Sequence, residues 1–377
     1  MSGGIQTAIP CALMRGGSSK GVYFLASDLP ADPDERKAVV LAIMGGADLR
    51  QIDGLGGADP LTSKAAVVGP SARDDADVDY LFLQIVVGEG WVDDTPNCGN
   101  ILAGVAPFAI ETGLVNATDG ETVVRIHMVN SGNLAELVVQ TSGGLVNYDG
   151  DVQIDGVPGT SAPIACNFID TAGSACGALL PTGNLQDEIE GIPVTCIDNG
   201  MPVVVMRARD LGRTGYESRD ELNADNELKI RLEAIRQKAG PMMNLGDITE
   251  KVVPKMCLIA PPRNGGAVTT RTFIPHTCHA AVGVLGAVSV ATACVLPGSV
   301  ADGTAVVAEG REKTLSVEHP SGEFTVTLVV NESGTLPVVE KAGLLRTARM
   351  IFRGNACLPS RIWGGRRNEN PGQVVRS

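Results

Sequence analysis

The chain of 377 residues is long for one hydrophobic core, so we expect two domains. Its formal net charge of −13 argues against binding to nucleic acid or to anionic membrane surfaces. Nine cysteines are scattered without a CxxC pair, and we find neither a signal peptide nor an apolar run of about 18 residues. These features favour a reduced, cytoplasmic protein over a disulfide framework or a membrane protein.

The first half begins with a pattern of strand, turn and strand. Apolar residues alternate from Ile9 to Leu25 and are interrupted by the polar, glycine-rich stretch 15–21. This turn combines a guanidinium, an ammonium and two hydroxyls with free backbone amides, so it is either an anion cradle or an ordinary hairpin turn. Its anion-binding candidates are Arg15, Ser18, Ser19 and Lys20.

A helix over 31–49 and a strand over 64–68 are predicted next, with a long glycine-rich loop between them. The loop ends at Lys64, immediately before the apolar strand. A lysine at such an edge is either partly desolvated, which favours the neutral amine that acts as a general base, or an ordinary surface lysine. Lys64 is therefore a candidate catalytic base.

Cys98 is the strongest single candidate in the chain. It lies in Pro96-Asn97-Cys98-Gly99-Asn100, directly before an apolar run that predicts a helix. A cysteine at the first turn of a helix is close to the positive end of the helix dipole, and the amides near Gly99 can hold a carboxylate. The alternative is a small buried core cysteine. A hairpin over 122–140 and a turn-rich bridge over 141–190 follow.

The second half repeats this order of elements. We expect strands over 192–197 and 202–206, a helix over 221–239, a strand over 255–259, a second cysteine with its helix, and a hairpin over 314–330. The domains are expected at 1–184 and 185–345, and a C-terminal segment over 346–377 is expected to pack back across them. The fold class predicted from this order is α+β, with two pseudo-symmetric domains that each hold a mixed sheet around a central helix.

The second cysteine, Cys278, is expected at a strand-to-helix junction like that of Cys98, flanked by His276 and His279. Arg271, on the strand that enters this turn, is either a cleft residue or surface-exposed. Candidates for holding carboxylates in this half are Asn199, Arg271, Cys278 and His279. No convincing set of metal ligands and no nucleotide-binding or pyridoxal-phosphate signature is found, so a cofactor-free reaction is the simplest interpretation.

Four motifs together resemble one family over nearly the whole chain. Residues 14–21, 51–57, 62–64 and 97–100 occur in the order typical of the PrpF family. This resemblance implies a two-domain diaminopimelate-epimerase-like fold, with a strongly curved sheet around each central helix. Ser18 stands where threonine is common in the family. Within the family, 56–64 and 98–105 are most similar to the 4-oxalomesaconate tautomerases (Δ-isomerases) of aromatic-acid breakdown.

The resemblance implies a reaction that needs no cofactor and no metal. A lysine and a cysteine share a 1,3-allylic proton shift on a small unsaturated tricarboxylate, and on this chain they are Lys64 as base and Cys98 as acid. Asn97, Gly99 and Asn100 join the carboxylate-binding candidates. A homodimer is possible.

Alternatives remain inside and outside this class. Within the family they are a 2-methylaconitate and a methylitaconate isomerase. Outside it they are an epimerase or racemase that uses Cys98 and Cys278 as opposed thiols, and a carboxylate-binding module without chemistry. His279 stands beside Cys278 where the epimerases carry a Cys-Gly motif, which weakens the two-thiol alternative.

Overall fold

The computed structural model describes residues 6–94, 96–169, 171–249, 251–331, 333–334 and 337–365. The chain divides into two compact units. Unit 1 consists of the residues up to Gly132, Leu137–Ile164 and the chain from Arg346, whereas unit 2 consists of Asn133–Glu136 and Ala165–Leu345. Within the described ranges, no helix is both long enough and apolar enough to cross a bilayer.

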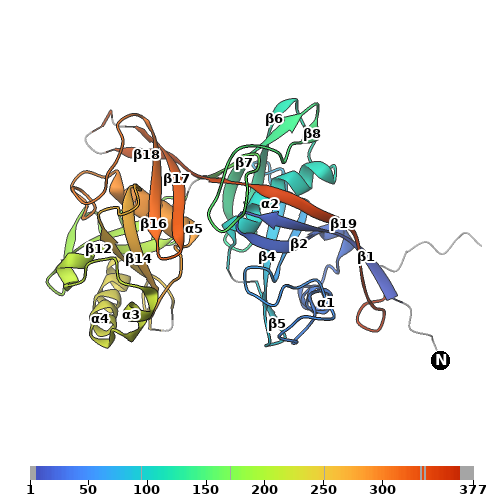
Figure 1. Cartoon of the computed structure of the whole chain (residues 1–377), viewed down its shortest axis with the longest axis horizontal. Coiled ribbons are helices and arrows are strands. Elements are labelled where there is room, and N and C mark those ends of the chain that lie inside the picture. Colours follow the sequence, from blue (N-terminus) through green and yellow to red (C-terminus); the bar gives the residue numbers. More distant parts are fainter. Residues whose placement is uncertain are drawn as a thin grey trace, which may run out of the picture. The chain divides into compact units, whose positions relative to one another are not determined.

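Unit 1 is built from an antiparallel and parallel set of strands with two α-helices (Figure 1). Its elements are β1 (Gln6–Gly16), β2 (Ser19–Leu25), η1 (Ala26–Asp28), α1 (Pro33–Met44), β3 (Lys64–Pro70), β4 (Val78–Val86), β5 (Trp91–Asp93), α2 (Gly99–Glu111), β6 (Gly120–Met128), β7 (Asn133–Ser142), β8 (Leu145–Val146) and, from the far end of the chain, β19 (Ala348–Pro359).

Unit 2 contains the middle of the chain and three α-helices. Its elements are β9 (Ile164–Ile169), β10 (Asp187–Ile189), β11 (Ile192–Asp198), β12 (Pro202–Arg207), η2 (Ala208–Leu211), α3 (Arg219–Ala224), α4 (Asn226–Met242), β13 (Lys255–Ala260), β14 (Val268–Ile274), β15 (Thr277–Cys278), α5 (Val284–Cys294), β16 (Glu312–His319), β17 (Gly322–Asn331) and β18 (Val338–Arg346).

The two units share one plan of strand pairing, which confirms the predicted duplication. In unit 1, β1–β2 is antiparallel, β2–β3 parallel, β3–β4 antiparallel and β4–β6 parallel. In unit 2, β11–β12, β12–β13, β13–β14 and β14–β16 repeat this sequence of directions. The predicted α+β class with a mixed sheet in each unit is therefore confirmed.

The register of the strands aligns the two units residue by residue. Leu25 pairs with Val68 immediately before η1, and Arg207 pairs with Ile259 immediately before η2. Val68 therefore occupies the position in unit 1 that Ile259 occupies in unit 2. Counting from this pair matches each remaining residue of β3 and β4 with one residue of β13 and β14.

One almost completely buried helix packs against the strands of each unit. α2 packs against β1, β2, β3 and β4, and α5 packs against β11, β12, β16 and β17 (Figure 1). Both sequences are apolar on all sides, as expected for a helix surrounded by protein. The other face of each sheet is covered by different helices. In unit 1, α1 shares a hydrophobic core with β2, β3 and β4, and in unit 2, α3 and α4 share one with β11–β14.

The predicted helices differ from the observed ones at chain-breaking residues. The helix expected over 31–49 ends at Met44 because Gly45 follows in a left-handed conformation, φ +101°. The single helix expected over 221–239 is two helices, because Asp225 ends α3 and caps α4 by accepting a hydrogen bond from Leu228 N at 3.0 Å.

The unit boundary lies after Ile164, whereas the sequence analysis placed it after residue 184. β9 accounts for the difference, because it pairs with β18 of unit 2. The C-terminal segment joins unit 1 through β19, which pairs antiparallel with β1 over the full length of that strand (Figure 1). Residues 366–377 of the predicted segment lie outside the described ranges.

Candidate functional site

Cys98 lies at the N-terminal end of the buried helix of unit 1. It is the N-cap of α2, with an extended backbone (φ −134°, ψ 99°) and a half-buried side chain. Its carbonyl accepts hydrogen bonds from Leu102 N at 3.0 Å and from the Tyr80 hydroxyl at 3.2 Å. The main chain is therefore held on two sides. The thiol makes no hydrogen bond to the described residues and lies at the positive end of the helix dipole.

Two buried tyrosines support this first turn of α2. The Tyr23 hydroxyl donates to the Ile101 carbonyl at 2.6 Å, beside the bond from Tyr80 to Cys98. Burial, and secondarily the neighbouring Cys98, raises the pKa of both tyrosines well above the ordinary value of 10. Both phenols therefore keep their protons and act as donors to the helix backbone. The sequence analysis missed both residues.

The turn between β1 and β2 packs directly on the start of α2. A Cβ at Gly16 would lie 2.5 Å from the Asn100 carbonyl oxygen, and one at Gly17 would lie 2.2 Å from Asn100 Oδ1. Gly17 also has φ +52°, which favours glycine. Asn100 Nδ2 in turn donates to Ser18 Oγ at 3.2 Å. Two motifs that lie about 80 residues apart in the sequence are thus in contact.

Arg15 is a partly buried guanidinium without an acidic partner in the described chain. Nη1 donates to the Gly17 carbonyl at 2.9 Å and to the carbonyl and hydroxyl of Thr347 at 3.1 and 2.8 Å, and Nη2 donates to Ser161 Oγ at 3.1 Å. Burial, followed by repulsion from Arg349, lowers its pKa. Neutral acceptors position this positive charge and do not neutralise it.

Two polar atoms beside these groups are buried and unsatisfied. Ser19 Oγ and Asn97 Oδ1 have no hydrogen-bond partner among the described residues, and Ser19 is only 2% exposed. An unsatisfied buried polar atom costs about 1–3 kcal/mol. The Ser19 hydroxyl can donate to an acceptor such as a carboxylate, whereas Asn97 Oδ1 needs a donor. Lys20 continues the turn, half-buried, and its backbone N donates to the Leu61 carbonyl at 2.9 Å.

Lys64 begins β3 and is only 7% exposed. Its Nζ donates to Gln84 Oε1 at 2.5 Å and lies 5.2 Å from the centroid of the Phe82 ring. The parallel neighbour on β2 is Gly21, where a Cβ would lie 2.7 Å from the Lys64 carbonyl oxygen. No carboxylate pairs with this lysine in the described chain. Its nitrogen is therefore held by a neutral amide and an aromatic face.

Gln84 fixes the direction in which Lys64 points. Its Nε2 donates to the carbonyls of Pro60, Ser63 and Ile85 at 3.2, 3.1 and 3.2 Å. Three acceptors around Nε2 set the orientation of the amide, so Oε1 must face the lysine. The sequence analysis missed Gln84, although a polar residue at an alternating position of an apolar strand was a usable signal.

Lys64 and Cys98 lie on the same face of β4. Tyr80, Phe82 and Gln84 alternate along this strand and therefore point to one side, about 6–7 Å apart in succession. The Tyr80 hydroxyl donates a hydrogen bond to the Cys98 carbonyl, whereas Phe82 and Gln84 contact the Lys64 side chain. The structure thus brings the predicted base and acid to one side of the unit 1 sheet, next to the polar turn.

The loop before Lys64 is held by a buried glutamine that the sequence analysis also missed. Gln51 is 1% exposed and has φ +46°; its Oε1 accepts from Ala58 N at 2.8 Å and from Ser63 Oγ at 2.6 Å. This residue ties both ends of the glycine-rich loop together and so fixes the start of β3.

The expected position of Cys278 is wrong. It lies in β15, is fully buried in the core shared with α3 and α4, and is followed by α5 only at Val284, whose N-cap is Gly283. Burial raises its pKa, although Arg271 and Arg219 oppose the shift. Gly283 is the N-cap of α5 as Cys98 is the N-cap of α2, so Gly283 takes the place of Cys98 at the helix start. A second thiol at the matching position is therefore absent, which removes the basis of the two-thiol alternative.

The other predicted carboxylate-binding residues of unit 2 lie in three different environments. Asn199 is buried; its Oδ1 accepts from Thr171 Oγ1 at 2.6 Å and its Nδ2 donates to Thr292 Oγ1 at 2.9 Å, so both ends of the amide are used internally. His279 is exposed, and its Nδ1 lies 3.0 Å from Ala281 N. Arg271 lines a pocket of unit 2.

Comparison with known proteins places this chain in a family. The family model of the PrpF protein matches residues 6–359. The chain is 59% identical over 360 residues to a 4-oxalomesaconate tautomerase of Pseudomonas putida, with 96% of this chain and 99% of the relative covered. It is 62% identical over 345 residues to a (4E)-oxalomesaconate Delta-isomerase of a Novosphingobium species, with 92% and 96% covered.

The solved structure of a methylitaconate-delta-isomerase is similar over the whole length. It has a TM-score of 0.84 and 35% sequence identity, and the match covers 97% of this chain and 100% of that one. Both the family model and the relatives thus span the two units. The chain belongs to the PrpF family.

Proposed function

We propose that this chain is an isomerase that moves a proton across an allylic unit of 4-oxalomesaconate, with Lys64 as base and Cys98 as acid. The observation that carries the proposal is the placement of both groups on one face of β4, beside a polar turn with an unpaired guanidinium. The names of the relatives at 59% and 62% identity support this substrate.

The proton balance of the reaction is simple. The Lys64 amine takes a proton from the carbon next to the substrate's unsaturated unit, and the electron pair of that C–H bond moves into a conjugated enolate. The Cys98 thiol then gives a proton to the far carbon, and the double bond shifts. A proton passing from the ammonium to the thiolate, directly or through solvent, restores both groups. No oxidant, reductant or further reactant is needed.

The turn and the helix start would stabilise the charge that develops. In this proposal, Arg15, Ser19 and the backbone amides at Gly99 and Asn100 hold the substrate carboxylates and the enolate oxygen. Fixed donors in a desolvated site lower the energy of an enolate more than mobile water does, because they need no reorganisation during the reaction. Gln84 acts as a positioning residue for Lys64.

The test is proton NMR in deuterated water with purified protein. We expect 4-oxalomesaconate to exchange its allylic hydrogens and to reach the tautomeric equilibrium. 2-Methylaconitate and methylitaconate, the substrates of the alternatives within the family, are measured at the same concentration. Faster turnover of either compound would overturn the proposed substrate, and binding without exchange of any compound would overturn the reaction.

A further inference from the structure

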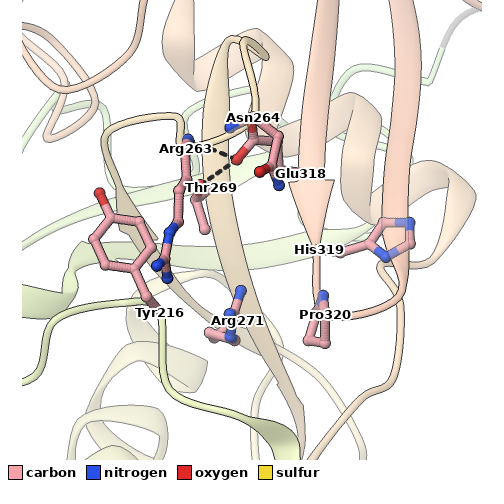
Figure 2. A pocket seen from close by; sticks show the side chains of 8 residues that line it. All are labelled: Tyr216, Arg263, Asn264, Thr269, Arg271, Glu318, His319 and Pro320. Atoms are coloured by element: carbon pink, nitrogen blue, oxygen red, sulfur yellow. Dashed lines mark hydrogen bonds between the residues drawn. The ribbon is translucent and has the colours of Figure 1, made fainter.

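Unit 2 contains a polar pocket that the proposed reaction does not use. Figure 2 shows its lining side chains, which come from the segment after η2, the loop before β14, β14 itself, and the end of β16. They are Tyr216, Arg263, Asn264, Thr269, Arg271, Glu318, His319 and Pro320.

Arg271 is the buried cation of this pocket. It is 8% exposed, its Nε donates to the Glu217 carbonyl at 2.7 Å, and its Nη1 donates to the Thr270 carbonyl at 2.8 Å. Nη2 has no protein acceptor in the described chain, and no described carboxylate forms an ion pair with the guanidinium. A buried charge is normally paired, so the open edge of this guanidinium is available to an anion.

Arg263 supplies a second guanidinium. Its Cζ lies 5.4 Å from the centroid of the Tyr216 ring, which holds the side chain against the pocket wall (Figure 2). The Tyr216 hydroxyl is itself fixed by donating to the Pro261 carbonyl at 2.9 Å. No acid pairs with Arg263 among the described residues. The two guanidiniums therefore both line the pocket with hydrogen-bonding capacity left over.

The acids nearby are already satisfied by other donors. Glu318 accepts from the backbone N of Arg263, Asn264 and Gly266 and from Thr269 Oγ1, at 2.9, 2.7, 2.9 and 2.5 Å. Burial alone would raise the pKa of Glu318, but these bonds lower it, so the carboxylate stays charged and orders the loop. The lining itself thus holds one charged carboxylate and two guanidiniums, and Glu217, outside the lining, also acts electrostatically on Arg271.

The pocket lies on the opposite face of the sheet from α5. Residues two apart on a strand point to the same side, so Arg271 shares its face of β14 with Phe273. Phe273 lies in the core of α3 and α4, and Arg271 therefore faces that side of the sheet. By register its counterpart in unit 1 is Leu81, since Leu81 pairs with Val67 as Arg271 pairs with Leu258.

We propose that this pocket is a second anion site, which binds a small polycarboxylate with one carboxylate on the free edge of Arg271 and another on Arg263. Guanidiniums bind carboxylates through charge-assisted, frequently bidentate hydrogen bonds. Two of them in one pocket select a ligand with more than one carboxylate. This inference rests on residues of unit 2 alone, whereas Lys64 and Cys98 belong to unit 1.

The experiment follows the arginine side chains directly. Protein with ¹⁵N-labelled arginine is titrated with tricarballylate, a saturated tricarboxylate that cannot tautomerise, and separately with inorganic phosphate. The Nε–H signal of Arg271 is assigned by its loss in Arg271→Leu, which installs the residue found at the matching position of unit 1. We expect tricarballylate to move this signal and to bind more tightly than phosphate.

Variants separate this site from the reacting one. Arg263→Gln, on an exposed loop, should raise the tricarballylate Kd measured at the Arg271 signal about tenfold, through loss of one charge-assisted contact. Lys64→Met should leave that Kd unchanged even though it should lower kcat about a thousandfold. An unmoved Arg271 signal at saturating tricarballylate, an Arg263→Gln Kd equal to wild type, or phosphate binding as tightly as tricarballylate would each overturn the proposal.

Discussion

At the residue scale, the two proposed reacting groups are held by different means. Cys98 is fixed through its backbone, by α2 and the Tyr80 hydroxyl, and its thiol is left unbonded. Lys64 is fixed through its side-chain nitrogen, by the oriented amide of Gln84 and the ring of Phe82. An unbonded thiol can deliver its proton, whereas a base must have its nitrogen held toward the carbon from which it takes a proton.

Replacing Lys64 with Met tests the base. We expect kcat to fall about a thousandfold with KM within a few-fold of wild type, since proton abstraction is lost while the carboxylate-binding groups remain. Steady-state kinetics at saturating substrate measures this. The control is Lys37→Met, which removes a lysine of α1 that forms an ion pair with Asp94. Near-normal turnover by the Lys64 variant would remove it from the mechanism.

Replacing Cys98 with Ser tests the acid. The hydroxyl has the right shape but gives up its proton far less readily than a thiol. We expect deuterium from solvent to enter one end of the allylic unit and no longer the other, as followed by NMR. Unchanged labelling at both ends would rule out the acid role.

Replacing Gln84 with Glu tests positioning through the pH profile. A carboxylate beside the Lys64 nitrogen stabilises the ammonium, so the acidic limb of kcat/KM should move to higher pH by about one unit. Gln84→Leu brings no charge and should lower kcat without moving that limb. A profile of the Glu variant that overlays the wild type would show that Gln84 does not act through Lys64.

At the element scale, the site depends on how closely the β1–β2 turn approaches α2. Gly16 and Gly17 let the turn touch Asn100, and this contact places Ser18 and the unsatisfied Ser19 hydroxyl at the helix start. Larger residues would push the turn away from the amides of α2. The geometry of the anion-binding groups is therefore a property of the packed pair of elements.

Gly17→Ala tests this contact against a matched control. Both Gly17 and Gly132 have positive φ, but a Cβ at Gly132 meets nothing within 4 Å, whereas one at Gly17 meets Asn100 Oδ1 at 2.2 Å. We expect both variants to lose about 1 kcal/mol of stability through backbone strain. Only Gly17→Ala should also lose substrate affinity, seen as a raised KM. Equal KM values for the two variants would contradict the role of the turn.

At the scale of the whole molecule, duplication gave both units the same scaffold, but only unit 1 holds the proposed reacting pair. Counting from the aligned strands, Lys64 corresponds to Lys255, and the N-cap of the buried helix is Cys98 in unit 1 but Gly283 in unit 2. The second unit thus kept the lysine and has no thiol at the start of its helix. Burial, with a smaller contribution from Arg236, lowers the pKa of Lys255 from 10.5 to about 8.

This lysine predicts a pH-dependent stability. Between pH 8 and 10.5 the unfolded chain binds a proton at Lys255 that the folded chain does not, so the free energy of unfolding rises with pH across that window. Below pH 8 Lys255 is protonated in both states, and the folded protein carries the full cost of burying the ammonium. Lys255→Met should therefore stabilise the protein at pH 7 by about 1 kcal/mol, allowing for partial exposure. Denaturant unfolding measures it, with exposed Lys238→Met as control. A gain that persists unchanged at pH 10.5 would contradict this assignment.

Local patterns were sufficient for the duplicated plan and for proposing the reacting residues of unit 1. Alternating apolar residues and glycine-rich turns predicted the hairpins, and the residues around Lys64 and Cys98 stood out by their glycine-rich loops. These signals are written in neighbouring residues, because turn conformations and strand alternation depend on the local backbone. The sequence by itself thus determined the order of the elements and the family resemblance.

Only the tertiary structure decided which side chains face one another. Gln84, Tyr23, Tyr80 and Gln51 act through partners that lie far away in the chain, so no local pattern assigns them. Cys278 looked equivalent to Cys98 in sequence, but the helix starts at Val284 and the thiol lies in a core. The physical reason is that the face a strand residue occupies, and the residue at which a helix begins, follow from strand register and packing across the unit.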